Sequence, residues 1–505
     1  MERSNVLESD VVIIGSGITG AALARELSKY KVETILVERA GAVCQGQSKV
    51  TQGSLYYGIR FAGSLILKSF ALPDGTPLLD LYDPERNVIK WCEQGFKEWP
   101  SIFEELEVKY RFLPDLYIAT GKEQIEALHA MRDLSLSIAE RYGKEKFRDF
   151  REVDKKEMLD LEPAVSENID AGIYAPDDGI DVFNPELVIA LTENAAQNGV
   201  KIMLDAEVTG ISKNGDYQTV TTSSGSVKTK FIINAAGRYA HIIADMGGYR
   251  DWNLEYWKSP LVILDRKLDG LINGVVRRPL LPGKMRTILP RDKNLMVQCG
   301  TYEKCSQEDT GIVSEDVLES VEMARELLPA ISKDHIITGF GGVRLFNTRD
   351  IEKHLIEFPP DNPKFLNAVI RMPGFTGAPP MCRHIVSMLG NAGLELVSKT
   401  DFNPRRKAIP RFRDLNNNER DKLIAKDSRY GRIICRCETV TEGEIVEAIK
   451  RGARTLDGVK FRTRAGMGRC QTNYCGHKVA SIIARELDLP LEAVTKKGVS
   501  SKFAA

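Results

Sequence analysis

The first forty residues alternate between short apolar runs and polar or glycine-rich connections. Val11–Ile14 is a continuous apolar run, typical of a buried strand. A glycine-rich turn follows directly, and small apolar residues over Ala21–Lys29 predict a helix that packs on that strand. A second apolar run, Thr34–Val37, predicts the next strand and ends at Glu38. The order strand, turn, helix, strand predicts a βαβ unit.

Helical and strand patterns are mixed over the rest of a large first region. We expect helices at Pro84–Trp99, Lys122–Tyr142 and Met381–Leu396, and strands at Lys201–Leu204, Phe231–Asn234 and Leu366–Arg371. From Leu261 to Glu357 the alternation predicts a sheet interrupted by one helix, Ser314–Leu328. These patterns place a second, sheet-rich part beside the βαβ unit.

The residue pattern changes after Ser398. Residues 399–431 are rich in Arg, Lys, Asp, Asn and Pro and poor in large apolar residues, which predicts a linker. Its basic residues, Arg405–Lys407, Arg411 and Arg413, indicate either a nucleic-acid or partner contact or a solvated connector of mixed charge, and we favour the connector. We therefore divide the chain into residues 1–398, the linker 399–431 and a small domain of residues 432–505.

Charge and composition narrow the classes of function. The 505 residues hold 70 Lys plus Arg and 70 Asp plus Glu, so the net charge is zero and a general nucleic-acid binder is disfavoured. No apolar run approaches the roughly 20 residues of a membrane helix, and Met1–Asp10 lacks the apolar region of a signal peptide. The nine cysteines do not form an extracellular disulfide pattern. We expect a soluble, cytoplasmic, reduced protein.

The glycine turn after the first strand has dinucleotide spacing. Gly15, Gly17 and Gly20 form a G-x-G-x-x-G motif between a predicted strand and a predicted helix. The glycines permit a tight turn and close approach of the backbone to a pyrophosphate, and the helix N-terminus offers free N–H groups. Glu38, which ends the next strand, is suited to accept hydrogen bonds from ribose hydroxyls. The motif predicts FAD or NAD rather than NADP.

A later strand decides between the two cofactors. Phe231–Gly237 runs from an apolar strand into small residues, and it resembles the second cofactor-contacting strand of flavoproteins with two dinucleotide-fold segments. The chain has no second glycine motif that would hold NAD as well. We therefore predict one dinucleotide, FAD, that accepts electrons from a substrate.

Four segments together resemble the D-amino-acid-oxidase-like superfamily. They are Val11–Glu38, Asn234–Gly237, Gly341–Arg344 and Pro373–Ala378. The resemblance implies an α/β FAD-binding Rossmann-like domain interleaved with a mostly antiparallel substrate-binding sheet, and hydride transfer to the flavin. It implies FAD contacts from Gly15, Gly17, Ile18, Gly20, Glu38, Arg39, Ser48, Thr51, Gly53, Val208, Ala236, Gly237, Gly374, Phe375 and Thr376.

Two arginines predict an anionic substrate. By the resemblance Arg344 binds the acidic end of the substrate, and a guanidinium suits carboxylate or phosphate. The stretch Tyr56–Phe61 is similar to the His-x-Gly-x-Arg-Tyr segment of glycerol-3-phosphate dehydrogenases, which implies that Arg60 helps to hold a phosphate. Tyr56 replaces the histidine, and a phenol with a pKa near 10 is a poor base. His354 and His384 are alternative bases, although each is more often a packing or surface histidine.

The small domain carries four cysteines in two pairs. Cys435 and Cys437 are separated by one residue, and Cys470 and Cys475 by four. Four thiolates suit a tetrahedral zinc or an iron–sulfur cluster. The spacing resembles the bacterioferritin-associated-ferredoxin-like [2Fe–2S] domain, and Thr463–Gln471 resembles the C-terminal domain of anaerobic glycerol-3-phosphate dehydrogenases. We predict a small α+β domain with a [2Fe–2S] cluster, a helix at Lys478–Leu487, and packing roles for the other five cysteines.

The combined prediction is an FAD- and iron–sulfur-dependent dehydrogenase. Its first substrate candidate is sn-glycerol 3-phosphate, oxidised to dihydroxyacetone phosphate. The alternatives are a 2-hydroxy-acid dehydrogenase, for example for L-2-hydroxyglutarate, an amino-acid or secondary-amine dehydrogenase, and a non-catalytic electron-transfer subunit. We expect a redox partner: a second subunit, a ferredoxin or flavodoxin, or a quinone-linked protein with at most peripheral membrane contact. The segment before Tyr56 offers no residue at the usual flavin attachment site, so we predict noncovalent FAD.

Overall fold

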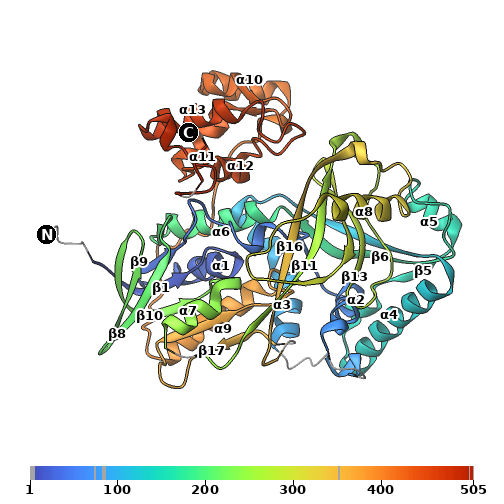
Figure 1. The fold of residues 1–505 in the computed structure, drawn as a ribbon, viewed down its shortest axis with the longest axis horizontal. Coiled ribbons are helices and arrows are strands. Elements are labelled where there is room, and N and C mark those ends of the chain that lie inside the picture. Colours follow the sequence, from blue (N-terminus) through green and yellow to red (C-terminus); the bar gives the residue numbers. More distant parts are fainter. Residues whose placement is uncertain are drawn as a thin grey trace.

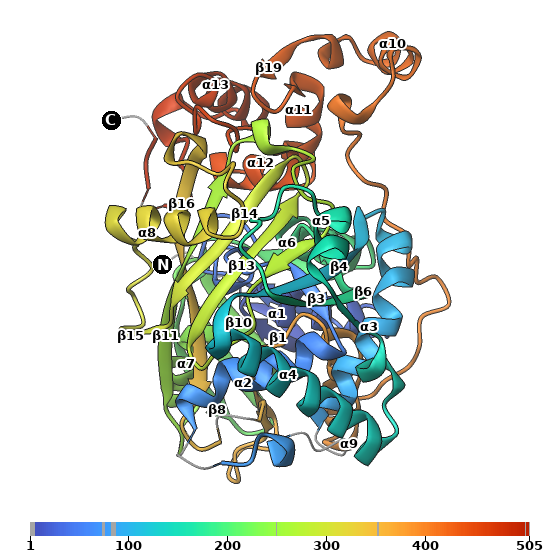
Figure 2. The same cartoon turned by 90° about the vertical axis from the view of Figure 1, so that its right-hand side faces the viewer.

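A large body carries a small domain at one end (Figure 1). The computed structural model describes residues 6–72, 76–81, 87–248, 250–350, 353–499 and 501–503. The body contains two sheets, and Figure 2 shows the small domain resting on the end of the body as a cap. Within the described residues, no helix combines the length and apolarity required to cross a bilayer.

The first sheet has a parallel centre. Its strand order is β17-β18-β10-β1-β2-β7, with an antiparallel hairpin added beside β10. The strands are β1 (Leu7–Ile14), β2 (Thr34–Val37), β7 (Lys201–Met203), β8 (Val208–Asn214), β9 (Tyr217–Thr222), β10 (Gly225–Asn234), β17 (Leu355–Glu357) and β18 (Phe365–Val369). Val11, Val12 and Ile13 of β1 are fully buried, because helices or strands cover both faces of a central parallel strand.

Three helices pack together on one face of this sheet. α1 (Ile18–Leu27) contacts α6 (Asn184–Gln197) and α9 (Ala378–Asn391), and their apolar residues share one core cluster with β1. The predicted strands of the βαβ unit are confirmed. The closing helix begins three residues before the expected Met381 and ends at Asn391, since Pro379 and Pro380 are tolerated in a first helical turn.

The second sheet is antiparallel except for one pair, β12 with β4. Its strands are β3 (Ser54–Tyr56), β4 (Tyr110–Ala119), β5 (Arg151–Val153), β6 (Ala171–Val182), β11 (Leu254–Leu264), β12 (Val275–Arg277), β13 (Lys284–Arg291), β14 (Asn294–Thr301), β15 (Glu303–Cys305) and β16 (Ile336–Asn347). The chain passes from one sheet to the other several times between β2 and β17. The predicted interleaved α/β architecture with a mostly antiparallel sheet is confirmed.

The remaining helices of the body cover the outside of the sheets. They are α2 (Ile59–Lys68), α3 (Asn87–Leu106), α4 (Gly121–Tyr142), α5 (Lys155–Leu161), α7 (Ala240–Met246) and α8 (Ser314–Arg325). α3 continues seven residues beyond the predicted end at Trp99 and contains Pro100. The start expected at Pro84 lies outside the described residues.

Within its described residues, the small domain contains two short strands and three α-helices. They are β19 (Ile433–Cys435), β20 (Val440–Thr441), α11 (Glu442–Lys450), α12 (Leu456–Thr463) and α13 (Gly476–Leu487). Both strands contribute to a separate apolar core with α11, α12 and α13. The predicted helix at Lys478–Leu487 is confirmed, and the structure starts it two residues earlier.

The linker before this domain differs from a solvated connector. It forms one helix, α10 (Asn417–Lys426), and its Arg406 is only 4% exposed. The Nε of Arg406 donates to Glu193 of α6 at 2.7 Å. Arg411 and Arg413 pair with Glu186 and Asp292 of the body. The linker arginines therefore hold the small domain to the body.

Candidate cofactor and substrate site

A cavity of about 700 Å³ is lined by residues of both sheets. Its volume is in the usual range for ligand pockets. Every residue predicted to contact FAD or substrate lines it, except Gly20. Residues far apart in sequence, from Gly15 to Thr376, are therefore brought together at one site.

The glycine turn has the conformation that a pyrophosphate site requires. Gly15 has a φ of +102°, and a Cβ there would lie 2.6 Å from the carbonyl oxygen of Ala235. A Cβ on Gly20 would lie 1.9 Å from the carbonyl oxygen of Gly15. Gly20 thus permits close packing of α1 rather than contact with a ligand. The Ile18 N–H, in the first turn of α1, donates to the Ser48 hydroxyl at 3.0 Å.

Glu38 lines the cavity at the end of β2. Its carboxylate accepts from the Ser16 N–H at 3.0 Å, the Ser16 hydroxyl at 2.5 Å and the Ala40 N–H at 3.0 Å. These bonds hold the carboxylate beside the glycine turn. This is the position from which an acid accepts ribose hydroxyls in dinucleotide folds.

The opposite part of the cavity is built by the chain before α9. The indole N–H of Trp99 donates to the carbonyl oxygens of Phe375 at 2.9 Å and Thr376 at 3.1 Å. The Tyr56 N–H donates to the Thr376 hydroxyl at 3.3 Å. A buried tryptophan on α3 thereby fixes the loop that carries the predicted FAD contacts Phe375 and Thr376.

Arg60 belongs to a buried charge network. Its guanidinium lies 4.7 Å from the centre of the Tyr56 ring, and its Nη2 donates to Gln52 at 2.8 Å. Its Nε lies 3.9 Å from Asp115, which accepts a bond of 2.9 Å from Arg277. Burial, followed by the charge of Arg277, lowers the pKa of Arg60, and Asp115 opposes this shift. The network orients a cation whose Nη1 makes no hydrogen bond within the described chain.

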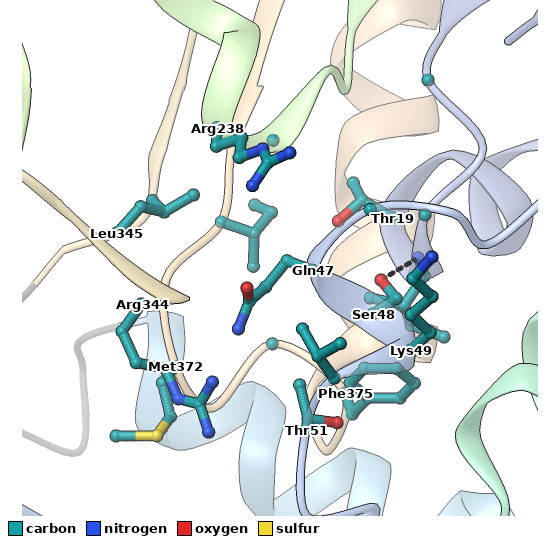
Figure 3. Close-up of a pocket in the computed structure, with 18 of the residues that line it drawn as sticks. Thr19, Gln47, Ser48, Lys49, Thr51, Arg238, Arg344, Leu345, Met372 and Phe375 are labelled. Carbon is teal, nitrogen blue, oxygen red and sulfur yellow. Dashed lines mark hydrogen bonds between the residues drawn. The ribbon is translucent and has the colours of Figure 1, made fainter. Parts of the chain in front are cut away.

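Arg344 enters the same cavity from β16. It is 8% exposed, and its Nη1 makes no hydrogen bond to any described residue. Figure 3 shows Arg344 and Gln47 pointing into the same space, with Met372 beside Arg344, and Phe375 next to Thr51. Buried donors without partners are costly, so this end of the cavity is suited to an anionic ligand.

The structure also places the candidate bases. Burial raises the pKa of Tyr56 above its ordinary value, although Arg60 opposes the shift, so Tyr56 is a neutral phenol. His354 accepts from the Arg371 N–H at 3.3 Å and packs on Trp91, and burial lowers its pKa well below the ordinary value. His384 also contacts Trp91. Neither histidine is among the described residues that line the cavity.

The four predicted metal ligands meet in the small domain as two pairs. The sulfurs of Cys437 and Cys470 lie 3.8 Å apart. Hydrogen bonding to Cys475 lowers the pKa of Cys435 to about 6, with burial opposing and the Gly466 and Glu438 N–H groups supporting the shift. Among the described residues no three such ligands converge as a site for a single ion. Two thiol pairs match a cluster in which each of two irons takes two cysteines.

Both sites fit their expected groups. The cavity has a glycine cradle at the helix N-terminus and, among the described residues, polar atoms without partners at the other end. In the small domain a Cβ on Gly468 would lie 2.3 Å from the Cβ of Cys437, so glycine is required beside the thiols. Of the other five cysteines, Cys44, Cys92, Cys299 and Cys382 are buried, as packing residues are, and Cys305 is partly exposed and packs against the edge of a core cluster.

Family comparisons agree with this geometry. The model of the FAD dependent oxidoreductase family matches residues 10–388, and that of the BFD-like [2Fe-2S] binding domain matches residues 433–485. The chain belongs to the FAD dependent oxidoreductase family. It is an oxidoreductase of the glycerol-3-phosphate dehydrogenase and oxidase type, with FAD and a [2Fe–2S] cluster as its cofactors.

Relatives in this family cover nearly the whole chain. Glycerol 3-phosphate dehydrogenase of Caloramator mitchellensis is 32% identical over 497 residues, 96% of each chain. A subunit of the anaerobic glycerol-3-phosphate dehydrogenase of Escherichia coli K12 is 21% identical, and the match covers 96% of this chain and 90% of that relative. FAD-bound L-alpha-glycerophosphate oxidase of Mycoplasma pneumoniae has a TM-score of 0.67 at 25% identity, covering 79% of this chain and 98% of its own.

Several lining residues carry no motif that would have revealed them. The cavity also contacts Gln47, Arg238, Arg277, Gln298, Tyr302 and Lys497. For Gln47, the only sequence feature that could indicate a place in the cavity is its position directly before the predicted FAD contact Ser48. Arg277 and Gln298 reach the cavity from β12 and β14 because of strand order, and Lys497 reaches it because of domain docking.

Proposed function

We propose that the protein oxidises sn-glycerol 3-phosphate to dihydroxyacetone phosphate and passes the electrons out through its [2Fe–2S] cluster. The observation that most supports this proposal is that two buried cations, Arg60 and Arg344, line one cavity. The Nη1 atom of each has no hydrogen-bond partner among the described residues. A phosphate dianion suits two guanidinium groups better than a single carboxylate does. The relative from Caloramator mitchellensis, named as a glycerol 3-phosphate dehydrogenase, supports this choice.

The residues of the cavity divide the work. FAD, when bound, supplies the acceptor for a hydride from the substrate carbon. Arg60 and Arg344 hold the phosphate, and the Asp115–Arg277 pair keeps Arg60 in place. Tyr56 is a neutral phenol next to Arg60, so it serves as a hydrogen-bond donor to a substrate oxygen rather than as a base. The hydroxyl proton passes to solvent water, because Tyr56 is already protonated and neither histidine is among the described residues that line the cavity.

The cluster has one edge closer to solvent. Cys435 and Cys475 are each 1% exposed, whereas Cys437 and Cys470 are partly exposed. A one-electron carrier beside a two-electron acceptor is useful when electrons leave singly. We infer that they leave at the Cys437–Cys470 edge to a redox partner.

Anaerobic flavin reduction tests the substrate. The purified holoenzyme is mixed separately with sn-glycerol 3-phosphate, L-2-hydroxyglutarate and sarcosine, and the flavin absorbance is followed. We expect bleaching by glycerol 3-phosphate alone. The Arg60→Lys variant keeps the charge beside Asp115 and should raise the KM for glycerol 3-phosphate about tenfold, since it loses the planar fork of donors.

Two outcomes would contradict the proposal. Bleaching by L-2-hydroxyglutarate alone would indicate a 2-hydroxy acid as the substrate, and bleaching by sarcosine alone would indicate an amine. No bleaching by any of the three, in a protein that shows both flavin and cluster bands, would favour a non-catalytic role in electron transfer.

A further inference from the structure

The end of the small domain contacts the loop that follows Glu38. The Gly41 N–H donates to the carbonyl oxygen of Lys497 at 3.0 Å, and the Val499 N–H donates to the Asp205 carboxylate at 3.3 Å. Gly498 has a φ of +144°, and a Cβ there would lie 2.9 Å from the Gly41 nitrogen. Backbone therefore packs directly on backbone at this contact, which fixes the position of Lys497.

The contacting segment is also held from within the small domain. The N–H groups of Leu456 and Asp457, at the start of α12, donate to the carbonyl oxygens of Thr495 and Lys496 at 3.1 and 2.9 Å. The Lys496 N–H donates to the carbonyl oxygen of Ser501 at 2.7 Å. These bonds make a tight loop, so the segment presents its side chains in a defined direction.

Lys497 lines the FAD cavity, although it belongs to the cluster-bearing domain. Glu38, Arg39, Ala206 and Glu207 line the same cavity, and the bond from Gly41 places Lys497 beside the chain that follows Glu38, at the end where dinucleotide folds hold adenosine. Lys497 makes no ion pair within the described residues. It is therefore a cation available to a ligand at the mouth of a site built for a pyrophosphate.

The charges around Lys497 favour an anion. Burial is the largest cause that lowers the pKa of Lys49 and of Lys460, and Asp457 opposes both shifts. Lys497 lowers both pKa values further, and Lys496 also lowers that of Lys460. The Asp205 carboxylate is occupied by the Val499 N–H, and Glu38 by Ser16 and Ala40. Asp205 and Glu38 thus have hydrogen-bond donors of their own, and Lys497 keeps its donors available, because its side chain makes no hydrogen bond or ion pair within the described residues.

We propose that Lys497 is a cofactor-binding residue, which the small domain contributes to the adenosine–pyrophosphate half of FAD. The same loop then ties the docking of the small domain to FAD, because a ligand that contacts both parts favours the docked arrangement. The cluster-bearing domain has a role in retaining the flavin in addition to carrying electrons.

FAD affinity tests this assignment without any turnover. Apoprotein of the full chain is titrated with FAD and the quenching of flavin fluorescence gives the Kd. We expect Lys497→Ala to raise the Kd about tenfold, as for loss of one charge-assisted hydrogen bond, and Lys497→Glu to raise it further. Lys496→Ala and Lys496→Glu are the matched controls, because Lys496 is exposed and adjacent but does not line the cavity.

Two further readouts separate binding from damage to the fold. The inhibition constant of ADP, which carries only adenosine and pyrophosphate, should rise in Lys497→Ala by about the same factor as the Kd of FAD. The iron content and the unfolding temperature of the apoprotein should match those of the Lys496 variants. A Kd within twofold of the wild type for Lys497→Glu, or an equal loss in Lys496→Glu, would overturn the proposal.

Discussion

At the scale of single residues, charged side chains are buried together beside the cavity. Arg60, Asp115, Asp178 and Arg277 are all nearly inaccessible to solvent, and two of them line the cavity. Buried charges require partners, and here Asp115 provides one for both Arg60 and Arg277. As a result, Arg60 is held at the cavity wall, and its Nη1 remains available to a ligand.

Arg344 is the residue where geometry matters more than charge. The Arg344→Lys variant keeps the positive charge but loses the fork of donors, so we expect the KM for the anionic substrate to rise about tenfold, with a smaller change in kcat. Steady-state kinetics measures both. Arg286→Lys is the control, because Arg286 donates to the Met285 carbonyl oxygen and does not line the cavity. Equal KM values for the two variants would show that Arg344 does not hold the substrate.

Asp178 predicts a dependence of stability on pH. Burial, followed by the charge of Asp115, raises its folded-state pKa to about 8, well above the ordinary value for an aspartate. The folded protein therefore holds a proton that the unfolded chain releases, and the free energy of unfolding falls as pH rises from about 4 to 8. Asp178→Asn removes this dependence of stability on pH, and its amide oxygen still accepts the hydrogen bond from the Arg60 backbone N–H.

Thermal unfolding at two pH values measures the Asp178 effect. The unfolding temperature of Asp178→Asn minus that of the wild type should be higher at pH 8 than at pH 5, by at least about 2 °C. A difference that is the same at both values would mean that Asp178 is already ionised in the folded state.

At the scale of elements, α6 connects the body, the linker and the small domain. Its Glu193 accepts from Arg406 at 2.7 Å and from Arg462 of α12 at 3.1 Å, and it lies 3.6 Å from Arg451. Burial alone would raise the pKa of Glu193, but Arg406 and Arg462 outweigh it and keep the pKa below its ordinary value. One carboxylate on a helix of the body thus balances arginines from two other segments.

Removal of that carboxylate should loosen the whole junction. Glu193→Ala leaves buried guanidinium groups unpaired, which costs about 3–5 kcal/mol for a broken buried pair. Limited proteolysis should then cut the linker faster, and the unfolding temperature should fall. Glu186→Ala is the comparison, because Glu186 on the same helix pairs with Arg411 alone among the described ion pairs. Equal rates of linker cleavage and equal unfolding temperatures in the two variants would show that Glu193 does not hold the linker and the small domain to the body.

At the scale of the whole molecule, two redox groups occupy one chain. The FAD cavity lies in the interleaved sheets, and the cysteine pairs lie in the domain that caps them (Figure 2). Contacts from Glu193, Asp292 and Gly41 to the linker and small domain fix the two parts against each other. A fixed arrangement suits electron transfer between the groups.

Loss of one of the four proposed cluster ligands should stop electron exit and leave reduction of the flavin by the substrate intact. In Cys437→Ser the cluster absorbance should be lost, while the substrate still bleaches the flavin under anaerobic conditions. Transfer to a one-electron acceptor should fall to a small fraction of the wild-type rate. Cys305→Ser is the control, since Cys305 is partly exposed and has no ligand spacing. Undiminished electron transfer in Cys437→Ser would place the exit elsewhere.

Local patterns were enough for the elements whose neighbours in sequence are their neighbours in space. Thr34–Val37 was predicted with its correct ends, because apolar runs and turn residues act within a few positions. The glycine motif, Glu38 and the paired cysteines were equally readable, since short spacings determine their chemistry. The end of α3, which continues past Pro100 to Leu106, and the start of α9 at Ala378 are less readable, because tertiary packing determines how far a helix continues.

The sequence by itself therefore determined the dinucleotide turn, the cysteine pairs and the choice of two arginines as anion-binding candidates. Tertiary structure alone decided that Arg277, Gln298 and Lys497 join the same cavity, and that His354 is a packed residue. It also decided that Arg406 of the linker is buried against Glu193. The physical reason is that strand order and domain docking bring together residues hundreds of positions apart, and such contacts leave no local pattern in the chain.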